Sequence, residues 1–432
     1  MAKKKTALTI EERLQQALVP AEEQPYEVPE NWVWVRLGAV CYASKEKSND
    51  FSNEIKYIGL EHLEKDKGIV GFSSADKVKS TKNAFQEGQI LYGRLRPYLN
   101  KHDIASFSGV CSTDILVFEA SVLVANVLVD KFFNLPFFIE YVVANSKGIN
   151  LPRVSEETVL NTTFPLPPLS EQQRIVECIE ELFAKLDEAK ERLQEVAESF
   201  AVRKAAILHK AFTGELTKQW RCENGVSDAS WEEKKLSEIT ENQDSKRIPL
   251  SKSQRDNMNR IYDYYGASGI IDKVDDYIFE GKKLLIGEDG ANLVTRSKNI
   301  AFIADGKYWV NNHAHILDVK DTVLLMYLCN YINNMDLIPY VTGSAQPKLT
   351  QAKMNNIKIF LPTLPEQHEI VRLIDDLVAR ERAAQQATEQ ALASIDLMKK
   401  SILARAFRGE LGTNKASEES ALELLRQVLA EN

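Results

Sequence analysis

The chain has 432 residues, of which 44% are hydrophobic and 27% are charged, and its formal net charge is −8. Its length exceeds the usual size of a single hydrophobic core, so we expect two or more domains. The sequence has no run of 18 apolar residues, which excludes a transmembrane helix, and its cysteines lack Cys-x-x-Cys spacing, which excludes a zinc ribbon. Five scattered cysteines are typical of reduced thiols, so these features favour a cytoplasmic protein.

In chain order, the first predicted element is a short helix. Thr9 and Glu12 have the spacing of a capping box, in which side chain and backbone bond reciprocally at a helix start, and this predicts a helix to about Leu18. A second amphipathic segment is expected at 419–429. We interpret both as docking helices for a partner or for the long helices described below.

An α/β module follows, in which apolar runs at 55–60, 89–91 and 109–118 predict strands and residues 122–144 predict a helix. Between 76 and 103 it has six Lys or Arg against three acids, and a Gly-x-x-x-Pro turn near its end precedes another cation. Such side chains contact phosphates and base edges in DNA, although a solvated charged loop has the same composition. The candidates for DNA binding in this module are Lys77, Lys79, Lys82, Asn83, Arg94, Arg96, Tyr98, Asn100, Lys101 and Arg153.

Residues 166–216 are repeated at 361–411 with a constant offset of 195 and no gap. Twenty of the 51 aligned residues are identical, where unrelated segments of average composition would share about 3 to 4. Two unrelated helices with one heptad pattern would not share their Leu-Pro-x-Leu-x-Glu-Gln starts and Ala-Phe-x-Gly-Glu-Leu ends. The same offset relates the Gly-x-x-x-Pro turns, and an offset of 199 relates Trp32 to Trp231, so module and helix were duplicated together.

Each repeated segment predicts one long helix. Ser170 with Gln173, and Thr363 with Glu366, have the spacing of capping boxes, and a glycine follows each helix where a left-handed cap is favoured. Apolar residues recur at steps of three and four, so each helix of about 40 residues, about 60 Å long, needs a partner helix. Antiparallel pairing with its own copy is favoured over parallel pairing between two chains. The residues assigned to this pairing are Ile175, Ile179, Leu182, Leu186, Leu193, Phe200, Ile207, Ile370, Ile374, Leu377, Ile395, Met398 and Ile402.

The second module repeats the α/β pattern, with predicted strands at 283–286, 299–303 and 313–319 and a helix at 322–332. Between 244 and 260, five Lys or Arg oppose two acids. Outside their Trp starts and Gly-x-x-x-Pro ends the modules share little sequence, as expected for two copies that read different targets, although neutral drift gives the same result. The candidates for DNA binding here are Lys246, Arg247, Lys252, Gln254, Arg255, Asn257, Arg260, Tyr264, Gln346 and Lys348.

Catalytic motifs are not evident in the sequence. It has neither a Gly-x4-Gly-Lys-Ser/Thr phosphate loop nor a Gly-x-Gly-x-x-Gly turn after a strand. Asn134-Leu-Pro-Phe137 is similar to the Asn-Pro-Pro-Phe/Tyr of amino-methyltransferases but lacks the second proline, so core packing is favoured. His313 and His315 have no third ligand nearby, which favours a structural or base-reading pair over a metal site. We therefore predict no catalytic residue and no metal.

The ordered double set of motifs resembles the specificity subunit of type I restriction–modification systems along essentially the whole chain. The motifs are Trp-x4-Leu at each module start, Gly-Ser-Ala-Gln-Pro-Lys-Leu in the second module, and the helix motifs given above. The resemblance implies an α+β fold with two α/β target recognition domains in tandem, each followed by a long helix. The two helices would pair as an antiparallel coiled coil with pseudo-two-fold symmetry. The implied division is an N-terminal tail with a docking helix (1–28), target recognition domain 1 (29–165), helical region 1 (166–217), target recognition domain 2 (218–360), helical region 2 (361–412) and a C-terminal short helix and tail (413–432).

The resemblance also implies that each module reads one half of a split, asymmetric site in double-stranded DNA. The helices would set the gap between the halves and dock two methyltransferase subunits, and two motor–nuclease subunits would cleave the DNA. S-adenosylmethionine, ATP and magnesium would belong to those partners, so this chain would be non-catalytic and hold no cofactor. Two other hypotheses stay open: a coiled-coil adaptor that does not bind DNA, and a nuclease whose site is assembled by folding. The target sequence cannot be read from these residues, because no simple code links side chains to bases in such a fold.

Overall fold

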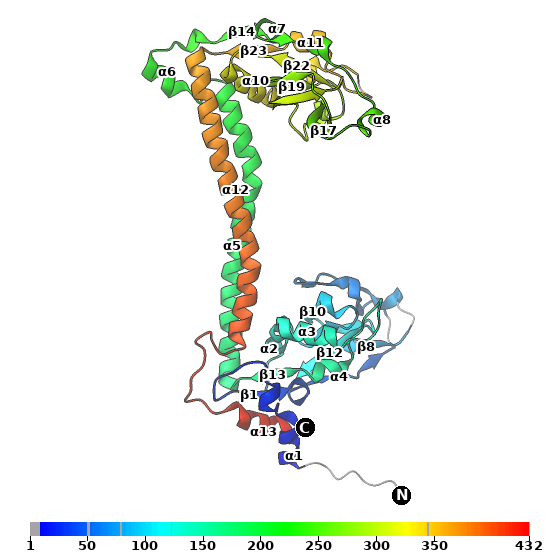
Figure 1. Cartoon of the computed structure of the whole chain (residues 1–432). Helices are drawn as coiled ribbons and strands as arrows, with labels where there is room; N and C mark the ends of the chain where they lie inside the picture. Colours follow the sequence, from blue (N-terminus) through cyan, green and yellow to red (C-terminus); the bar gives the residue numbers. More distant parts are fainter. Residues whose placement is uncertain (1–8, 50–51, 78–79, 122, 344, 432) are drawn as a thin grey trace. The chain divides into compact units, whose positions relative to one another are not determined.

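The computed structural model describes residues 9–49, 52–77, 80–121, 123–343 and 345–431. The chain divides into two compact units, which we call unit 1 (Met1–Leu193 with Ala391–Asn432) and unit 2 (Gln194–Gln390). The division falls within both long helices, α5 (Leu169–Phe212) and α12 (Leu364–Ala406), which are labelled in Figure 1. Each unit therefore contains one module and one stretch of each long helix.

Module 1, the α/β part of unit 1, is built from two sheets and a set of helices. One sheet has the strand order β10 (His102–Ile104), β9 (Ile90–Gly93), β12 (Ile115–Ala120), β2 (Cys41–Ala43). The other has the order β3 (Lys47–Ser48), β8 (Lys82–Phe85), β11 (Gly109–Cys111), β4 (Lys56–Ile58), β7 (Ser73–Ser74), and β5 (Leu63–Glu64) pairs with β6 (Gly68–Ile69). The helices are α2 (Asn126–Phe132), α3 (Pro136–Ala144) and α4 (Glu156–Leu160). Along β9, Ile90 and Tyr92 pack with α2 and α3 while Leu91 packs with the second sheet, so the central strands are buried on both faces.

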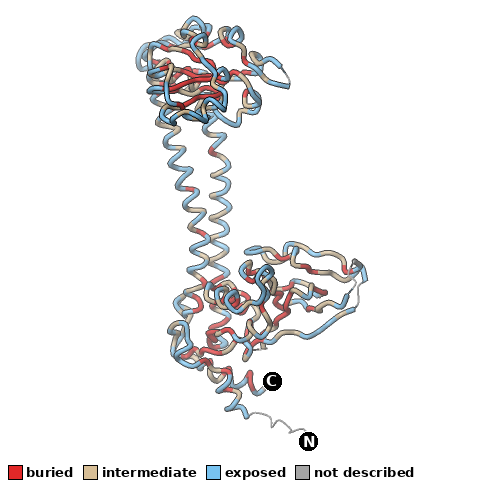
Figure 2. The backbone as a smooth tube through the Cα atoms, turned by 45° about the vertical axis from the view of Figure 1, so that its right-hand side comes forward, coloured by how far each residue is buried: buried red, intermediate tan, exposed pale blue. Residues whose placement is uncertain are grey.

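Module 2, the α/β part of unit 2, has the same layers. Its first sheet has the order β15 (Glu241–Asn242), β22 (Ala314–Asp318), β19 (Lys283–Gly287), β20 (Ala301–Ala304). Its second has the order β17 (Gly269–Val274), β16 (Tyr262–Gly266), β21 (Lys307–Val310), β18 (Phe279–Glu280). The helices are α7 (Leu236–Ile239), α8 (Lys252–Arg255), α9 (Asn292–Thr295), α10 (Thr322–Asn334) and α11 (Gln351–Asn355). Leu284 and Ile286 of β19 pack with α10, and Leu285 packs with the second sheet. Figure 2 shows the buried residues gathered in the strands of this module.

The topologies of the two modules correspond strand by strand, although their sequences do not. The order β10-β9-β12-β2 matches β20-β19-β22-β15, and β8-β11-β4-β7 matches β18-β21-β16-β17. In both second sheets the central strand has one parallel neighbour, β11 with β4 and β21 with β16. Each module is closed by a two-stranded ribbon that pairs its first and last strands, β1 (Val33–Arg36) with β13 (Thr163–Leu166) and β14 (Glu232–Lys235) with β23 (Lys358–Leu361). Val33 pairs with Leu166 in module 1, and Glu232 pairs with Leu361 at the matching place in module 2. The first strand of each ribbon therefore follows the sequence offset of 199, and its partner strand follows the offset of 195.

The predicted elements are largely confirmed, with two corrections in module 1. The predicted strand at 109–118 is two strands, because a turn at Ser112 closed by the Ile115 amide sends them into different sheets. The predicted helix at 122–144 is two helices, because Pro136 cannot continue the first one and starts the second. A short apolar run cannot reveal either break without the tertiary contacts.

The two long helices pair antiparallel within each unit. In unit 1 an Asp187 oxygen lies 2.6 Å from Lys399 Nζ and Asp396 lies 3.4 Å from Lys190. Residue numbers therefore rise along α5 as they fall along α12, which confirms the predicted antiparallel pairing. In unit 2, Arg203 bonds Glu381 at 3.0 Å. The predicted seam residues are buried or half-buried except Met398, which is 50% exposed; Lys399 turns inward instead and lies over the Phe183 ring.

The ends of the long helices confirm the glycine caps but not the capping boxes. Gly214 and Gly409 have φ of +77° and +73°, the left-handed conformation that ends a helix. Helix α5 already includes Ser170, so this residue cannot cap it. Thr363 does precede α12, but the Glu366 carboxylate points into the protein to Thr217, Arg221 and Trp231. The prediction of capping boxes at both starts was therefore wrong.

Each unit holds a buried glutamate clamp where one long helix starts and the other has ended. In unit 1 the Glu171 carboxylate accepts hydrogen bonds from Trp32 Nε1 at 2.7 Å, Thr413 Oγ1 at 3.0 Å and Asn414 Nδ2 at 2.7 Å. In unit 2, Glu366 takes the same place, and both carboxylates are fully buried. The neighbouring glutamines, Gln172 and Gln367, donate to the proline carbonyls just ahead of each helix.

This clamp explains why the repeats share both helix motifs. Because the helices are antiparallel, the Glu-Gln start of one repeat meets the Gly-Glu-Leu end of the other. A Cβ on Gly409 would lie 2.4 Å from Pro29, and one on Gly214 would lie 3.2 Å from Arg221 Nη1, so the glycines also leave room for the neighbouring residues of the joint. The matched residues are therefore the two sides of one joint.

The terminal helices are part of unit 1. The capping box of Thr9 and Glu12 is present at the start of α1 (Ile10–Ala17). Helix α13 (Ala421–Glu431) packs on α1, and Leu14 and Leu425 belong to the module 1 core. Figure 1 shows both helices beside the β1–β13 ribbon. They are docked on unit 1, in a core cluster that also contains Ile175 of α5 and Leu403 of α12. Within the described residues no helix is long and apolar enough to cross a membrane.

Candidate nucleic-acid interface

Each module has the same backbone frame at one end of its first sheet. In module 1 the Arg94 amide donates to the Asp114 carbonyl, and the Val154 amide donates to Arg94. In module 2 the Glu288 amide donates to His313 and the Leu349 amide to Glu288 in the same pattern. We call the matched positions 94/288, 95/289, 114/313 and 153/348 the frame positions. They hold Arg, Leu, Asp and Arg in module 1 but Glu, Asp, His and Lys in module 2.

The Gly-x-x-x-Pro turns lie on these frames. Lys147 pairs with Arg153 across the turn in module 1, as Thr342 does with Lys348 in module 2. The turn glycines have φ of +106° and +81°, which favours glycine at both places. The Arg96 amide donates to the turn proline at 2.7 Å, and the residue itself has a left-handed φ of +53°. Backbone of this kind outside glycine is costly and is found most often at functional sites.

Several predicted residues of module 1 are gathered around this turn. Arg96 is exposed, and among the described residues its guanidinium has no hydrogen bond or ion pair. Tyr98 is 49% exposed on the next turn. Lys101 donates to the Leu60 carbonyl at 2.9 Å, and Arg153 bonds Asp114 at 2.9 Å while remaining 43% exposed. These four side chains give module 1 a cationic rim with one aromatic ring.

The other candidates of module 1 have different places. Lys82 and Asn83 lie on β8 in the second sheet, where Asn83 donates to the Ile115 carbonyl at 2.8 Å. Arg94 is half-buried and its Nε lies in the interior, so this side chain lies beneath the rim and is less exposed than the other cations. Asn100 is only 6% exposed and donates to the Phe133 carbonyl, so the structure places it in the core and not on the rim. Lys79 lies outside the described residues, as does the side chain of Lys77.

In module 2 the exposed donors surround the 244–260 loop and the turn. Lys246, Lys252, Arg260 and Gln346 are exposed, and within the described chain their side chains make no hydrogen bond or ion pair. Two amides there act locally, because Gln254 accepts from the backbone at the start of α8 and Asn257 donates to the Ser253 carbonyl; both remain exposed. Lys348 reaches Glu288 at 3.1 Å and is 49% exposed.

Three predicted residues of module 2 are held inside it. Tyr264 is 1% exposed, under the Arg255 guanidinium, with its hydroxyl bonded to Leu250. Arg255 itself bonds Asp272 at 2.9 Å. Arg247, 14% exposed, bonds Glu288 at 2.6 Å and the Ala314 carbonyl at 2.8 Å. Tyr264 is therefore a core residue, and the two arginines fix the loop instead of projecting from it.

Beneath the module 2 frame lies a buried charged network centred on His315. Its ring nitrogens contact Asp244 at 2.6 Å and the Leu349 carbonyl at 2.7 Å, so both face acceptors. Burial alone would raise the pKa of Asp244, but hydrogen bonds from His315 and from the backbone bring this pKa below its usual 3.8. Burial would likewise raise the pKa of Glu288, but the hydrogen bonds from Arg247 and Lys348 outweigh this effect and hold the pKa below its usual 4.5. Both carboxylates stay ionised and hold the frame in place.

The remaining sequence candidates have structural partners. Asn134 lies between α2 and α3 and shares a buried hydrogen-bond group with His102, Asp130 and Asn100, which explains it as core packing. His313 bonds Asp289 at 2.8 Å and is 50% exposed. In the part of the chain that the structure describes, no group of three His, Cys, Asp or Glu residues could hold a metal ion.

Comparison with known proteins decides the family. A family model described as the type I restriction modification DNA specificity domain matches residues 29–198 and 229–392, one match for each module with part of its helix. The chain belongs to this family.

Individual relatives agree with this assignment. The chain is 35% identical over 210 residues to the EcoDI specificity subunit of Escherichia coli, which covers 46% of this chain and 45% of that one. It is 24% identical over 414 residues to the MjaVIII specificity subunit of Methanocaldococcus jannaschii, covering 84% and 91%. The EcoDI subunit is thus matched over less than half of its length, and so is a putative type I specificity subunit of Haemophilus influenzae, which is 39% identical over 154 residues and covers 35% of this chain and 38% of that one. The HsdS subunit of Thermoanaerobacter tengcongensis has the same fold, with a TM-score of 0.68 at 22% identity, covering 90% of this chain and 100% of that one.

Sequence reasoning missed the acidic half of the frame. Asp114 and Glu288 position the cations that were predicted, and Asp289 holds His313. A signal did exist in module 2, where Glu288 and Asp289 follow the predicted strand at 283–286 within three residues, whereas Asp114 falls inside the predicted strand at 109–118. Asp114 and Glu288 were not predicted because only cations, amides and aromatic residues were taken as candidates for DNA binding, and these carboxylates act by orienting the cations.

Proposed function

We propose that this chain is the DNA sequence-recognition subunit of a type I restriction–modification complex, with each module reading one half of a split, asymmetric site. The observation that carries the proposal is the pair of frames: the same backbone pattern presents different side chains in the two modules. A repeated frame gives each module the same approach to the duplex, and different side chains give each its own base contacts. A DNA-independent adaptor would have no need of this arrangement.

The chemistry then belongs to partners. We assign methylation with S-adenosylmethionine to two modification subunits, and ATP- and magnesium-dependent cleavage to two restriction subunits. Modification of a base inside a duplex requires that the base be flipped out into a catalytic pocket. The role left to this chain is to hold the duplex in one register while partners act on it, so we propose that it is not an enzyme.

Exchange of one module tests the proposal. Residues 30–160 run from just before β1 to the end of α4, so their replacement by the first module of another family member exchanges the frame but keeps both helices. We expect genome-wide mapping of methylated adenines to show a new sequence in one half-site only. A change in both halves would refute readout by separate modules. A purified complex that showed no salt-dependent DNA binding would instead favour the adaptor.

The paired helices are proposed to set the gap between the half-sites. Insertion of one heptad into both helices lengthens them by about 10 Å, or about 3 base pairs at 3.4 Å each. The expected result is a methylated site whose halves are unchanged but lie further apart. If the longer protein still recognised the original spacing, the helices would not measure the gap.

A further inference from the structure

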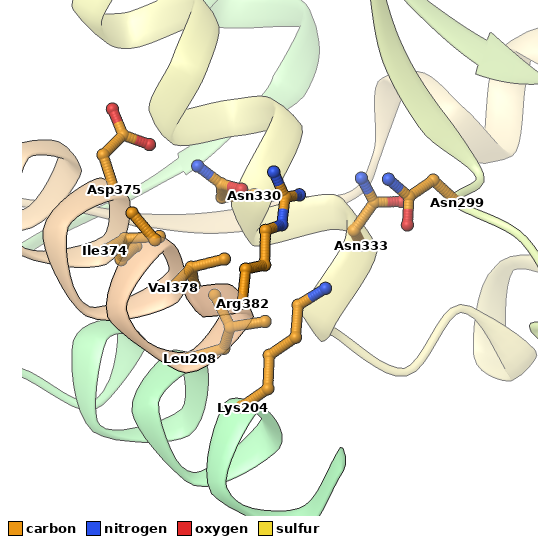
Figure 3. Close-up of a pocket in the computed structure, with 10 residues that line it drawn as sticks. Lys204, Leu208, Asn299, Asn330, Asn333, Ile374, Asp375, Val378 and Arg382 are labelled. Atoms are coloured by element: carbon orange, nitrogen blue, oxygen red, sulfur yellow. The ribbon is translucent and has the colours of Figure 1, made fainter. Parts of the chain in front are cut away.

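Unit 2 contains a pocket of about 210 Å³ between its two helix stretches and α10. Lys204 of α5 and Arg382 of α12 line it, together with Asn299 and Asn330 of module 2. Figure 3 shows the ammonium and guanidinium groups extending toward the asparagine amides, while the carboxylate of Asp375 points away. The pocket floor is apolar, formed by Leu208, Ile374 and Val378.

The two cations of the pocket lack anionic partners. Among the described residues neither has a hydrogen bond or ion pair, and neither has an acid three or four places away on its own helix. Glu381, next to Arg382, is already bonded to Arg203. Asn330 and Asn299 likewise keep their amides free in the described contacts, whereas Asn333 uses its amide on the Ala301 backbone. The pocket therefore presents several unpaired N–H donors, and the described contacts include no bond from either cation to Asp375, the acid in its lining.

At the matching place in unit 1 the charges are paired. The offset of 195 relates Lys204 to Lys399 and Asp187 to Arg382. In unit 1 the lysine bonds the aspartate at 2.6 Å and lies over Phe183. In unit 2 the aspartate is replaced by an arginine, so two like charges share a pocket where unit 1 has an ion pair. Such an arrangement is stabilised by an anion from outside the chain.

We propose that this pocket binds a backbone phosphate of the duplex held by module 2, an inference that rests on the proposed function. A phosphate diester offers two charged oxygens, which match the guanidinium, the ammonium and the asparagine amides. DNA is favoured over a carboxylate of a protein partner because the pocket and the frame meet at the same end of the β19–β20 pair. The Gly287 amide donates to the Ile300 carbonyl, so Asn299 of the pocket lies just past this pair on one strand and Glu288 of the frame lies just past it on the other. This contact fixes register and carries no sequence preference.

The test is a salt titration of DNA binding by the full chain assembled with its proposed modification subunits. The double variant Lys204→Gln with Arg382→Gln is expected to bind its site about three- to tenfold more weakly, with the salt slope reduced by about 1. Discrimination against a mismatched site stays unchanged. Arg382→Asp, which copies unit 1, is expected to weaken binding at least as much. The matched control is Lys185→Gln with Arg380→Gln, which removes two cations paired with Glu181 and Asp376 on the same helices.

Each outcome is decisive. A salt slope equal to wild type in the pocket variant, or an equal loss in the control, overturns the phosphate site. An unchanged slope together with weaker assembly of the complex without DNA assigns the pocket to a partner carboxylate and also overturns it. Absence of specific DNA binding by the wild-type complex overturns the proposed function itself, and this inference with it.

Discussion

In unit 1 a buried glutamate accepts hydrogen bonds from a tryptophan indole and a threonine hydroxyl. In unit 2 another buried glutamate accepts hydrogen bonds from the same two kinds of group. At the frame positions, by contrast, the two modules have a different residue type at every matched position. The clamp depends on side chains, so its glutamate and its tryptophan are retained in both repeats. The frame depends on backbone hydrogen bonds, which any residue can make, so its side chains are free to differ. This contrast separates the residues that build the protein from those available for reading DNA.

The clamps differ in one respect, and this gives the largest predicted effect. Glu366 also bonds Arg221, which is 7% exposed, whereas the partners of Glu171 are neutral. Glu366→Ala leaves a buried cation whose remaining ion pair in the described chain is with the exposed Asp228, so we expect unit 2 to lose about 3–5 kcal/mol. Glu171→Ala leaves neutral donors unpaired and should cost unit 1 about 2–3 kcal/mol. Chemical denaturation followed by hydrogen exchange in each unit measures both.

A double variant shows whether the charge is the cause. Glu366→Met with Arg221→Met removes both ions and should recover much of the stability lost by Glu366→Ala, because apolar replacements of a buried pair are often tolerated. Equal losses for Glu366→Ala and Glu171→Ala would show that the arginine adds nothing to the clamp.

The next effect concerns the network under the module 2 frame. Module 1 has Leu116 where module 2 has His315, by strand register. His315→Leu leaves Asp244 without its ring partner, and we expect a loss of about 1–3 kcal/mol in unit 2 at neutral pH. Because the folded pKa values of Asp244 and Glu288 lie below 3.8 and 4.5, their stabilisation is complete above those values and is lost as the pH falls below them.

Acid titration of unfolding checks the sign of this effect. Unit 2 of the wild-type chain should lose stability as the pH falls below about 4.5, and His315→Leu should make that dependence shallower. The opposite change, Leu116→His in module 1, buries an imidazole without a partner and should destabilise unit 1. A variant that kept the full acid dependence would show that His315 does not lower the two pKa values.

Much of the fold could be predicted because it rests on local signals. Helix periodicity gave both long helices and their antiparallel pairing, and Gly214 and Gly409 were recognised as caps from the chain alone. Ser170 was misassigned because α5 starts at Leu169, where the Pro168 carbonyl accepts from the Glu171 and Gln172 amides. Met398 was misassigned because Asp187, distant in sequence, draws Lys399 into the seam. Such choices between adjacent residues depend on the partner helix.

The candidate site was less predictable, because composition does not show which side chains are free. Arg96 and Arg247 look alike in the sequence, yet one is exposed and the other bonds two buried acids. The aromatic residue of each patch shows the same difference, with Tyr98 exposed and Tyr264 buried. Sheet pairing decides these cases, since it determines which residues of a basic stretch face the core.

The smallest predicted effect compares the two turns. A Cβ on Gly343 would lie 2.6 Å from the Gln346 carbonyl oxygen, and one on Gly148 would lie 3.0 Å from that of Leu151. With both φ positive, alanine costs about 1–2 kcal/mol at each turn, and more at Gly343 because the backbone there must also move. Gly343→Ala should therefore speed hydrogen exchange at 342–348 more than Gly148→Ala speeds it at 147–153. Gly71→Ala is the control, because a Cβ there meets nothing within 4 Å. If Gly343→Ala left both exchange and DNA affinity unchanged, the turn would not need glycine, and the frame would tolerate more variation than its shared backbone pattern implies.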